Sequence, residues 1–375
     1  MEYMNQLNCL PQDAIFWGHD ILPTAVASLD QHGIRRPLTF TVEPLRDFHA
    51  QHLQAHVKGG LGVFTDLPPH APDVGVRRAL EACLHAGADS IIALGGGSVI
   101  DAAKAVSHLH HQETGRHLAI AALPTTFSGS EFSHYFGITE TTGPQTFKRS
   151  YAVRETVPKV VALDPKLLLN TPRELLLSSA IKGIDHAVEG MRQVTIDHPH
   201  AILAAAGVER FLAVLEKWPQ QLDTQRALRE RHVTTDDLLQ LQLAAWQSYF
   251  FPASVIYGLS HRIGHILGGT FGLPHSITSC ITLAPVLRAC AESYGDKLQI
   301  FCRGRATSNA AALLADRISN AVEHLGLPHR LRSVDFDRAQ LPRVAALLQQ
   351  NYANEVGDLG DGNGATLNGF LESLW

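Results

Sequence analysis

The chain is poor in cysteine and has no pair of cysteines at CxxC spacing. Its 375 residues include five cysteines, an odd number, and these are scattered along the sequence: Cys9, Cys83, Cys280, Cys290 and Cys302. The pattern excludes a zinc ribbon, argues against a disulfide framework and favours reduced thiols in a cytosolic protein. The N-terminal residues form neither a basic segment nor an apolar one, so no secretion signal is predicted and the expected location is cytoplasmic.

The chain also lacks an excess of positive charge and any long hydrophobic run. Its formal net charge is −5, which gives no basic face and makes nucleic acid an unexpected partner. The longest apolar runs, at residues 90–94 and 119–123, have the length of strands and are far too short to span a membrane. With 45% hydrophobic and 18% charged residues, the composition is that of a soluble globular protein, and its length predicts two domains.

The first part of the chain alternates between strand-like and helix-like segments. Strands are predicted at residues 37–42, 62–65, 90–94 and 119–123, and helices at residues 74–86 and 98–109. Gly87 directly follows the first of these helices and is a typical helix stop. This order of elements predicts an α/β fold with a parallel, doubly wound sheet.

From Pro172 onward the sequence is dominated by helical patterns separated by turn signals. Helices are predicted at residues 173–193, 199–217, 226–250, 277–294, 308–325 and 338–352. We therefore expect an N-terminal α/β domain at residues 1–165 and an all-helical domain at residues 166–375. The boundary is placed near Asp164 and Pro165, which interrupt the pattern.

A glycine turn, Gly95-Gly96-Gly97-Ser98, lies between a predicted strand and a predicted helix. Glycines let a backbone approach a phosphate closely, and a helix N-terminus offers free N–H groups. Asp101 follows on the first turn of the helix, where its carboxylate can reach a sugar or a nicotinamide. The turn is neither a GxGxxG fingerprint nor a Walker loop, and a tight turn capped by Ser98 is the alternative interpretation.

A second loop, Pro124-Thr125-Thr126-Phe127-Ser128-Gly129-Ser130-Glu131, follows the next predicted strand and is rich in hydroxyl groups. Ligands of parallel sheets collect at the carboxyl ends of the strands. The two loops together therefore predict a dinucleotide-binding cleft, although either loop alone could be an ordinary turn.

Three histidines, His261, His265 and His275, surround a glycine-rich break within an apolar, helix-like segment. The first two are four residues apart and share one helix face. Glycine and proline residues allow the chain to return His275 toward the same point, and His186 is a plausible fourth partner from another helix. The grouping suits a metal site or an acid/base site, and buried histidines bonded to backbone carbonyls are the alternative.

The order of these motifs resembles the iron-containing (group III) alcohol dehydrogenase superfamily, from about Ile15 to Ala284. The shared features are GGGSxxDxxK, PTT…GSE, a His–Ala–x–Glu helix and HxxxH followed by a histidine ten residues later. The resemblance implies a dehydroquinate synthase-like fold and a homodimer, with a dinucleotide-binding domain at residues 1–165, a catalytic domain at residues 166–375 and the active site between them. It also implies NAD(H) or NADP(H) as cofactor, and its cofactor contacts map onto Gly96, Gly97, Ser98, Asp101, Thr125, Thr126, Ser133 and Lys148, with Gly95 in the same turn.

The metal of this superfamily is held by one aspartate and three histidines, and the histidines map onto His186, His261 and His275. The aspartate position lies four residues before His186, and here it is Lys182. A cation beside a dication is unfavourable at the dielectric constant of a protein. Asp185, adjacent to His186, is expected to point elsewhere on the helix and to be a poor substitute. An iron or zinc site is therefore only a candidate.

In lacking this aspartate the chain resembles the maleylacetate reductase branch, which also lacks it and is regarded as metal-independent. The shorter loop PTTFSGSE and the segment from His265 to His275 are similar to that branch as well. The branch usually has asparagine at the position of Lys182 and lacks the aspartate at Asp101, so the match is incomplete.

The residues predict reduction of a polarised, anionic substrate, and the resemblance implies an NAD(P)-dependent reductase of a keto or enone acid, or of an aldehyde. The proton would come from His265 or His186, with Lys182 as an alternative acid, and Lys182, Arg149 and Arg154 could bind carboxylates. Glu43, after a strand, favours NAD over NADP because a carboxylate binds the ribose 2′-hydroxyl and repels a phosphate.

Three other functions remain open. One is a metal-dependent alcohol or aldehyde dehydrogenase that uses His186, His261 and His275. The others are a non-redox lyase similar to dehydroquinate synthases and a binding protein without turnover. Metal analysis and activity after chelation distinguish the first, and steady NADH consumption with a carbonyl substrate excludes the lyase. The several histidines argue against the binding protein.

Overall fold

The computed structural model describes residues 7–68, 72–140, 147–302, 307, 309–360 and 364–375, in two compact units. We call Asn8–Thr171 with Thr234–Leu243 the sheet unit, and Leu7, Pro172–Val233 and Ala244–Trp375 the helical unit. The functional division predicted at residues 1–165 and 166–375 stays a prediction. Within the described residues, no helix combines the length and the apolar character that crossing a membrane requires.

The sheet unit is built on six parallel strands in the order β1-β8-β5-β4-β2-β3. The strands are β1 (Ala14–Trp17), β2 (Pro37–Phe40), β3 (Val63–Phe64), β4 (Ser90–Gly95), β5 (Ala119–Pro124) and β8 (Val160–Leu163). The helices of this unit are α1 (Leu22–Ala27), α2 (Arg46–His52), α3 (Asp73–Ala86) and α4 (Gly97–Thr114). The central strands are buried on both faces, as expected of a parallel sheet between helices.

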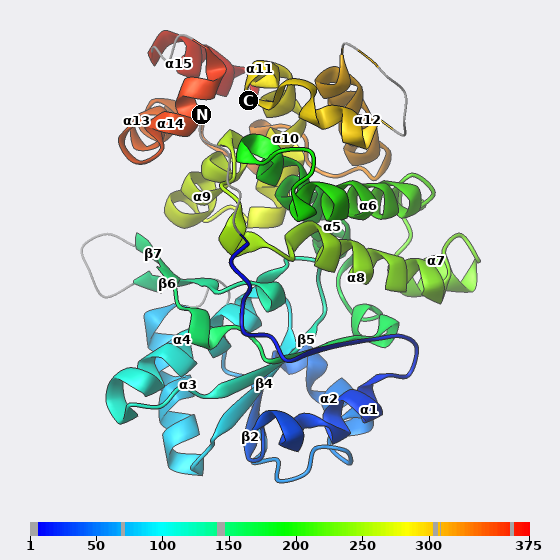
Figure 1. Cartoon of the computed structure of the whole chain (residues 1–375), viewed down its shortest axis with the longest axis vertical. Coiled ribbons are helices and arrows are strands. Elements are labelled where there is room, and N and C mark those ends of the chain that lie inside the picture. Colours follow the sequence, from blue (N-terminus) through cyan, green and yellow to red (C-terminus); the bar gives the residue numbers. More distant parts are fainter. Residues whose placement is uncertain (1–6, 69–71, 141–146, 303–306, 308, 361–363) are drawn as a thin grey trace. The chain divides into compact units, whose positions relative to one another are not determined.

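Helices cover both faces of this sheet (Figure 1). Leu94 and Leu123 pack with Leu22 of α1 and Phe48 of α2 in one hydrophobic cluster. The opposite face is covered by α3 and α4, and α4 contacts both β4 and β5. The predicted α/β class with a parallel sheet is thereby confirmed.

An antiparallel hairpin of β6 (Tyr135–Glu140) and β7 (Phe147–Ala152) was not predicted from the sequence. It packs on α4, and its rings stack, with 5.2 Å between the centroids of Phe136 and Tyr151. The hairpin follows the hydroxyl-rich loop directly, so it anchors the end of that loop.

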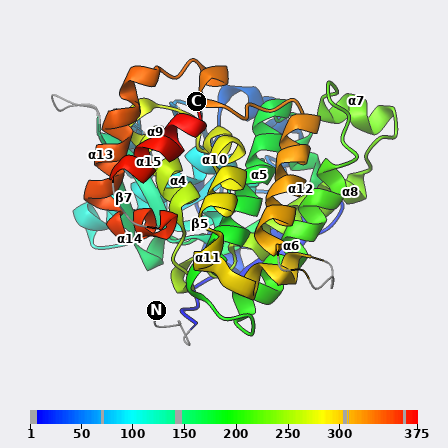
Figure 2. The ribbon, with the colours of Figure 1, turned by 90° about the horizontal axis from the view of Figure 1, so that it is seen from above.

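The helical unit is organised around α10 (His275–Ala289), which packs mainly against three other helices (Figure 2). These three are α5 (Arg173–Glu189), α9 (Leu259–Phe271) and α12 (Ala310–His324). The remaining helices of this unit are α6 (Pro199–Leu215), α7 (Thr224–Arg229), α11 (Ala291–Tyr294), α13 (Leu341–Asn351), α14 (Ala353–Val356) and α15 (Gly364–Ser373), and α8 (Thr235–Tyr249) belongs to the sheet unit up to Leu243. The predicted helical second half is confirmed.

The single helix predicted at residues 226–250 is wrong, because the chain breaks between α7 and α8. Arg231 has a positive φ of 60°, which ends α7. Thr234 then starts α8 with a reciprocal cap: its Oγ1 accepts from the Asp237 N–H at 3.1 Å, and Asp237 Oδ2 accepts from the Thr234 N–H at 2.8 Å. This threonine–x–x–acid spacing is a capping box, a signal that the sequence contained.

Candidate functional site

The glycine turn lies at the carboxyl end of β4, beside the loop that follows β5. Gly95 and Pro124 are paired in register, so both loops begin at the same edge of the sheet. Among the residues that the structure describes, no side chain caps the start of helix α4 at Gly97, so its first N–H groups can meet a ligand. A Cβ at Gly97 would lie 2.8 Å from Ser128 Oγ, so glycine is needed for the two loops to approach. The turn fits the pyrophosphate of a dinucleotide.

The predicted contacts of the second loop are largely buried. Thr125, Thr126 and Ser133 are exposed by 5%, 5% and 1%. The N–H of Thr125 donates to the Gly95 carbonyl at 3.1 Å, and its own carbonyl accepts from Thr171 Oγ1 at 2.8 Å. Ser133 Oγ accepts from the Tyr135 N–H at 2.9 Å. Thr125 and Ser133 therefore hold the loop in shape, and Ser98, in contrast, is exposed.

Asp101 binds a side chain of the protein. Its Oδ1 accepts from Ser130 Oγ at 2.5 Å, and Lys104 Nζ donates to the same hydroxyl at 2.9 Å. Burial lowers the pKa of Lys104 to about 8 and raises the pKa of the neighbouring Glu131 to about 7. These side chains fix the hydroxyl-rich loop on α4, which is a function that the sequence analysis did not anticipate for Lys104.

Two further predicted cofactor residues lie at the edges of the sheet unit. Glu43 starts a 3₁₀ turn after β2, and its Oε1 accepts from Arg46 Nε at 2.8 Å. Lys148 lies in β7 opposite Thr139, but its side chain is outside the described part of the structure. Their roles stay predictions.

In the helical unit, three helices bring together the histidines that the sequence analysis grouped. We call His186 of α5, His261 and His265 of α9, and His275 at the start of α10 the histidine cluster. Ring centroids lie 5.3 Å apart for His186 and His261, 4.5 Å for His261 and His265, and 5.4 Å for His265 and His275. His186 and His261 are buried, whereas His265 and His275 are half-buried.

The end of α9 returns His275 to the cluster. Gly272 takes the left-handed conformation with a φ of 74°, and the Gly272 N–H donates to the Gly268 carbonyl at 3.2 Å. This bond with a left-handed glycine is the αL type of helix stop, and the N–H of Leu273 donates in addition to the Leu267 carbonyl at 3.1 Å. A Cβ at Gly268 would lie 3.0 Å from His275 Nε2, so this glycine makes room for the imidazole.

Lys182 projects into the histidine cluster from α5. Its Nζ donates to Asp185 Oδ2 at 2.7 Å and to His261 Nδ1 at 3.0 Å. Asp185 Oδ2 also accepts from Ser279 Oγ of α10 at 2.7 Å. The prediction that Asp185 points away is wrong, because residues three apart on a helix are neighbours on its surface.

The buried imidazoles of the cluster are held neutral. Burial lowers the pKa of His186 and His261 well below the usual value, and the charge of Lys182 lowers both further. The ring of His186 stacks on Tyr249, with 4.0 Å between centroids, and the ring of His261 stacks on Tyr257 at 4.6 Å. These two histidines are therefore fixed and uncharged, and the half-buried pair is better placed to meet a substrate.

The cluster does not fit the divalent metal that the motif order implies. His261 Nδ1 already faces an ammonium, and a dication at the same imidazoles would be repelled by it. Two unit charges about 4 Å apart repel by about 4 kcal/mol at an effective dielectric constant near 20, and a dication doubles that value. Among the described residues, no group of three His, Cys, Asp or Glu side chains is arranged to hold a metal ion.

Glu189, the acidic residue of the His–Ala–x–Glu motif, organises the site. Its Oε2 accepts from the His261 N–H at 3.1 Å, so it caps the start of α9, and its Oε1 accepts from the Tyr294 hydroxyl. Burial raises the pKa of Glu189.

Arg262 of α9 is held by a carboxylate from the C-terminal segment. Its Nε donates to Glu355 Oε1 at 2.8 Å.

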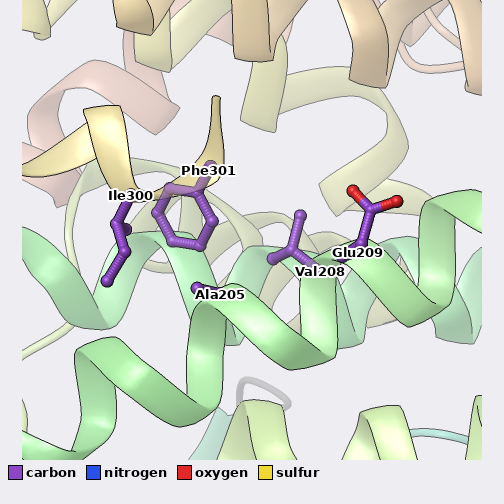
Figure 3. A pocket seen from close by; sticks show the side chains of 5 residues that line it. All are labelled: Ala205, Val208, Glu209, Ile300 and Phe301. Carbon is purple, nitrogen blue, oxygen red and sulfur yellow. The ribbon is translucent and has the colours of Figure 1, made fainter. Parts of the chain in front are cut away.

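A hollow of about 180 Å³ lies elsewhere in the helical unit, between α6 and the segment before Cys302 (Figure 3). It is lined by Ala205, Val208, Glu209, Ile300 and Phe301. None of the predicted site residues lines it, and its apolar walls offer a single carboxylate.

Two family models match the chain. The model described as "Iron-containing alcohol dehydrogenase" matches residues 11–165, and "Fe-containing alcohol dehydrogenase family, C-terminal" matches residues 252–356. The first covers most of the sheet unit and the second covers the segment that contains His261, His265 and His275.

Similar proteins extend over nearly the whole chain. Maleylacetate reductase from Delftia acidovorans is 29% identical over 342 residues, which are 91% of this chain and 90% of that protein. Maleylacetate reductase 2 from Cupriavidus pinatubonensis is 32% identical over 260 residues, which are 69% of this chain and 67% of that protein. The crystal structure of sulfoacetaldehyde reductase from Bifidobacterium kashiwanohense in complex with NAD⁺ shares the fold, with a TM-score of 0.80, 20% identity and 98% of each chain covered. The chain therefore belongs to the iron-containing alcohol dehydrogenase family and is an NAD(P)-dependent oxidoreductase that acts on a small molecule.

Proposed function

We propose that the chain reduces an anionic keto or enone acid with NAD(P)H and without a divalent metal, as a maleylacetate reductase-like enzyme. The observation that carries this proposal is the ammonium of Lys182 in the histidine cluster, 3.0 Å from His261 Nδ1. The similarity to maleylacetate reductases supports the substrate class.

The residues of the helical unit would bind the substrate and supply a proton. An ammonium has three N–H donors. Among the described residues, Asp185 and His261 accept two of them, so the third would bind a substrate oxygen. His265 is half-buried and would deliver the proton, because a general acid must reach solvent to be reprotonated. His186 and His261, held neutral, would orient these two groups.

The sheet unit would bind the cofactor. The turn from Gly95 to Ser98 would face the pyrophosphate, with Thr125 and Thr126 beside it. Bound NAD(P)H supplies the hydride. Glu43, at the end of β2, would favour NAD(H) by accepting from a ribose hydroxyl and repelling a 2′-phosphate.

The test is the oxidation of NADH by purified protein with a 4-oxo-2-enedioate, compared with an uncharged aldehyde of similar length. We expect turnover of the dicarboxylate, a preference of at least about tenfold in kcat/KM, and no loss after treatment with a chelator. Loss on chelation with recovery on adding Zn²⁺ or Fe²⁺ would instead support a metal-dependent alcohol dehydrogenase. Product formation without net NADH consumption would support a lyase.

A further inference from the structure

One buried ammonium contacts side chains of two helices, and a third helix holds its carboxylate partner. The side chain of Lys182 on α5 is 8% exposed, and its bonded partner Asp185 is fully buried. Asp185 is in turn bound by Ser279 of α10, and Lys182 reaches His261 of α9. The lysine therefore has a defined position inside the unit.

The ammonium determines the state of its neighbours. It can only donate hydrogen bonds, so Nδ1 of His261 must accept, and the proton of the neutral ring lies on Nε2. The carboxylate of Asp185 balances its charge, as a buried ion requires. The cluster thus already contains one cation and one carboxylate beside its imidazoles.

We propose that Lys182, held by Asp185 and Ser279, is a built-in cation that occupies the histidine cluster and prevents a divalent metal from binding there. The inference deepens the proposed metal-independent reduction. It is tested by metal binding without substrate, so that it and the proposed function can fail separately.

The first experiment titrates the full chain with Co²⁺ and follows the ligand-field absorption bands and the bound metal. We expect the wild type and His261→Ala to bind Co²⁺ with the same affinity, because the histidine cluster takes no part in binding the metal. If the wild type binds one Co²⁺ per chain and His261→Ala does not, the proposal is wrong.

The second experiment replaces the cation. Lys182→Asp places a carboxylate one helical turn before His186, and we expect it to bind one Co²⁺ per chain at least 100-fold more tightly than the wild type. Lys217→Asp makes the same charge change at an exposed position of the helical unit and should bind as the wild type does. Equal affinities of wild type and Lys182→Asp would contradict the inference. If Lys182→Asp does not fold, Lys182→Asn provides the same comparison, with an expected gain of at least tenfold.

The third experiment reads the tautomer directly. In a protein with ¹⁵N-labelled histidine, the resonances missing from the His261→Ala spectrum identify this ring. We expect an unprotonated Nδ1 and a protonated Nε2 in the wild type. A protonated Nδ1 would mean that Lys182 does not donate to this ring, and the proposal would be wrong.

Discussion

Lys182 and Asp185 form a buried ion pair, and only Lys182 is expected to contact the substrate. Lys182→Ala leaves Asp185 buried without its cation, and we expect the free energy of unfolding to fall by about 3 kcal/mol. Lys182→Ala/Asp185→Ala removes both charges and should regain most of that loss. Urea unfolding of the two single variants and the double variant measures this coupling.

The same three variants separate a catalytic role from a structural one. Because the substrate contact is lost with the ammonium, kcat/KM should stay at least about 100-fold below the wild type in both Lys182→Ala and the double variant. A double variant that regains both stability and activity would show that the lysine only neutralises Asp185.

Glu43 is expected to control the choice between NADH and NADPH. Glu43→Ala removes the carboxylate and releases Arg46, which then can meet a 2′-phosphate. We expect the ratio of kcat/KM for NADPH to that for NADH to rise about tenfold, which corresponds to about 1.4 kcal/mol. Arg46→Ala is the control, because it keeps the repelling carboxylate and should not raise the ratio. An unchanged ratio in Glu43→Ala would exclude a role for this residue.

At the scale of the element, the stop of α9 is expected to determine where His275 lies. Gly272 has a φ of 74°, which an alanine adopts at a cost of about 1 kcal/mol. We expect Gly272→Ala to lower the unfolding free energy by that amount. It should also lower kcat/KM at least about tenfold, because His275 contacts the proposed acid His265, with 5.4 Å between ring centroids, and a shift of about 1 Å in a catalytic group is sufficient.

A matched control exists at the end of α4. Gly115 has a φ of 75°, and a Cβ would meet no atom within 4 Å at either glycine. Gly115→Ala should therefore lower stability equally and leave kcat/KM unchanged. If the two variants lose the same activity, the effect is one of stability alone.

The elements that the sequence predicted are those whose signals are local. The helix at residues 74–86 ends at Gly87 as expected, and the HxxxH spacing placed His261 and His265 on one face. The break between α7 and α8 was overlooked, although the capping box at Thr234 lies in the sequence. The contacts of Glu189 could not be predicted, because its partner Tyr294 is 105 residues away.

At the scale of the whole molecule, the two units carry different chemistry and different buried charges. The helical unit keeps a lysine and a carboxylate at the histidines. The sheet unit buries Glu131, the last residue of the loop that is expected to touch the cofactor, and Lys104 of α4. The predicted homodimer would add a partner, and its existence stays a prediction to be tested by sedimentation.

The buried Glu131 makes the stability of the sheet unit depend on pH. Burial raises its pKa from 4.5 to about 7, and its Oε2 has no hydrogen-bond partner among the described residues. Between these two pH values the folded state keeps a proton that the unfolded state has lost. The unfolding free energy should therefore fall as the pH rises from 4.5 to 7, by up to about 3 kcal/mol.

Urea unfolding at pH 5 and at pH 7.5 measures this difference. In Glu131→Gln the carboxamide cannot ionise. The decrease in unfolding free energy between pH 5 and pH 7.5 should therefore be smaller than in the wild type by the contribution of Glu131. Glu113→Gln changes an exposed residue of α4 and should keep the wild-type decrease. Burial lowers the pKa of Lys104 from 10.5 to about 8. Above pH 8 the unfolded state keeps a proton that the folded state has lost. Lys104 therefore raises the unfolding free energy with pH, and only above pH 8. An identical pH dependence in wild type and Glu131→Gln would mean that Glu131 is ionised in the folded protein and paired with Lys104.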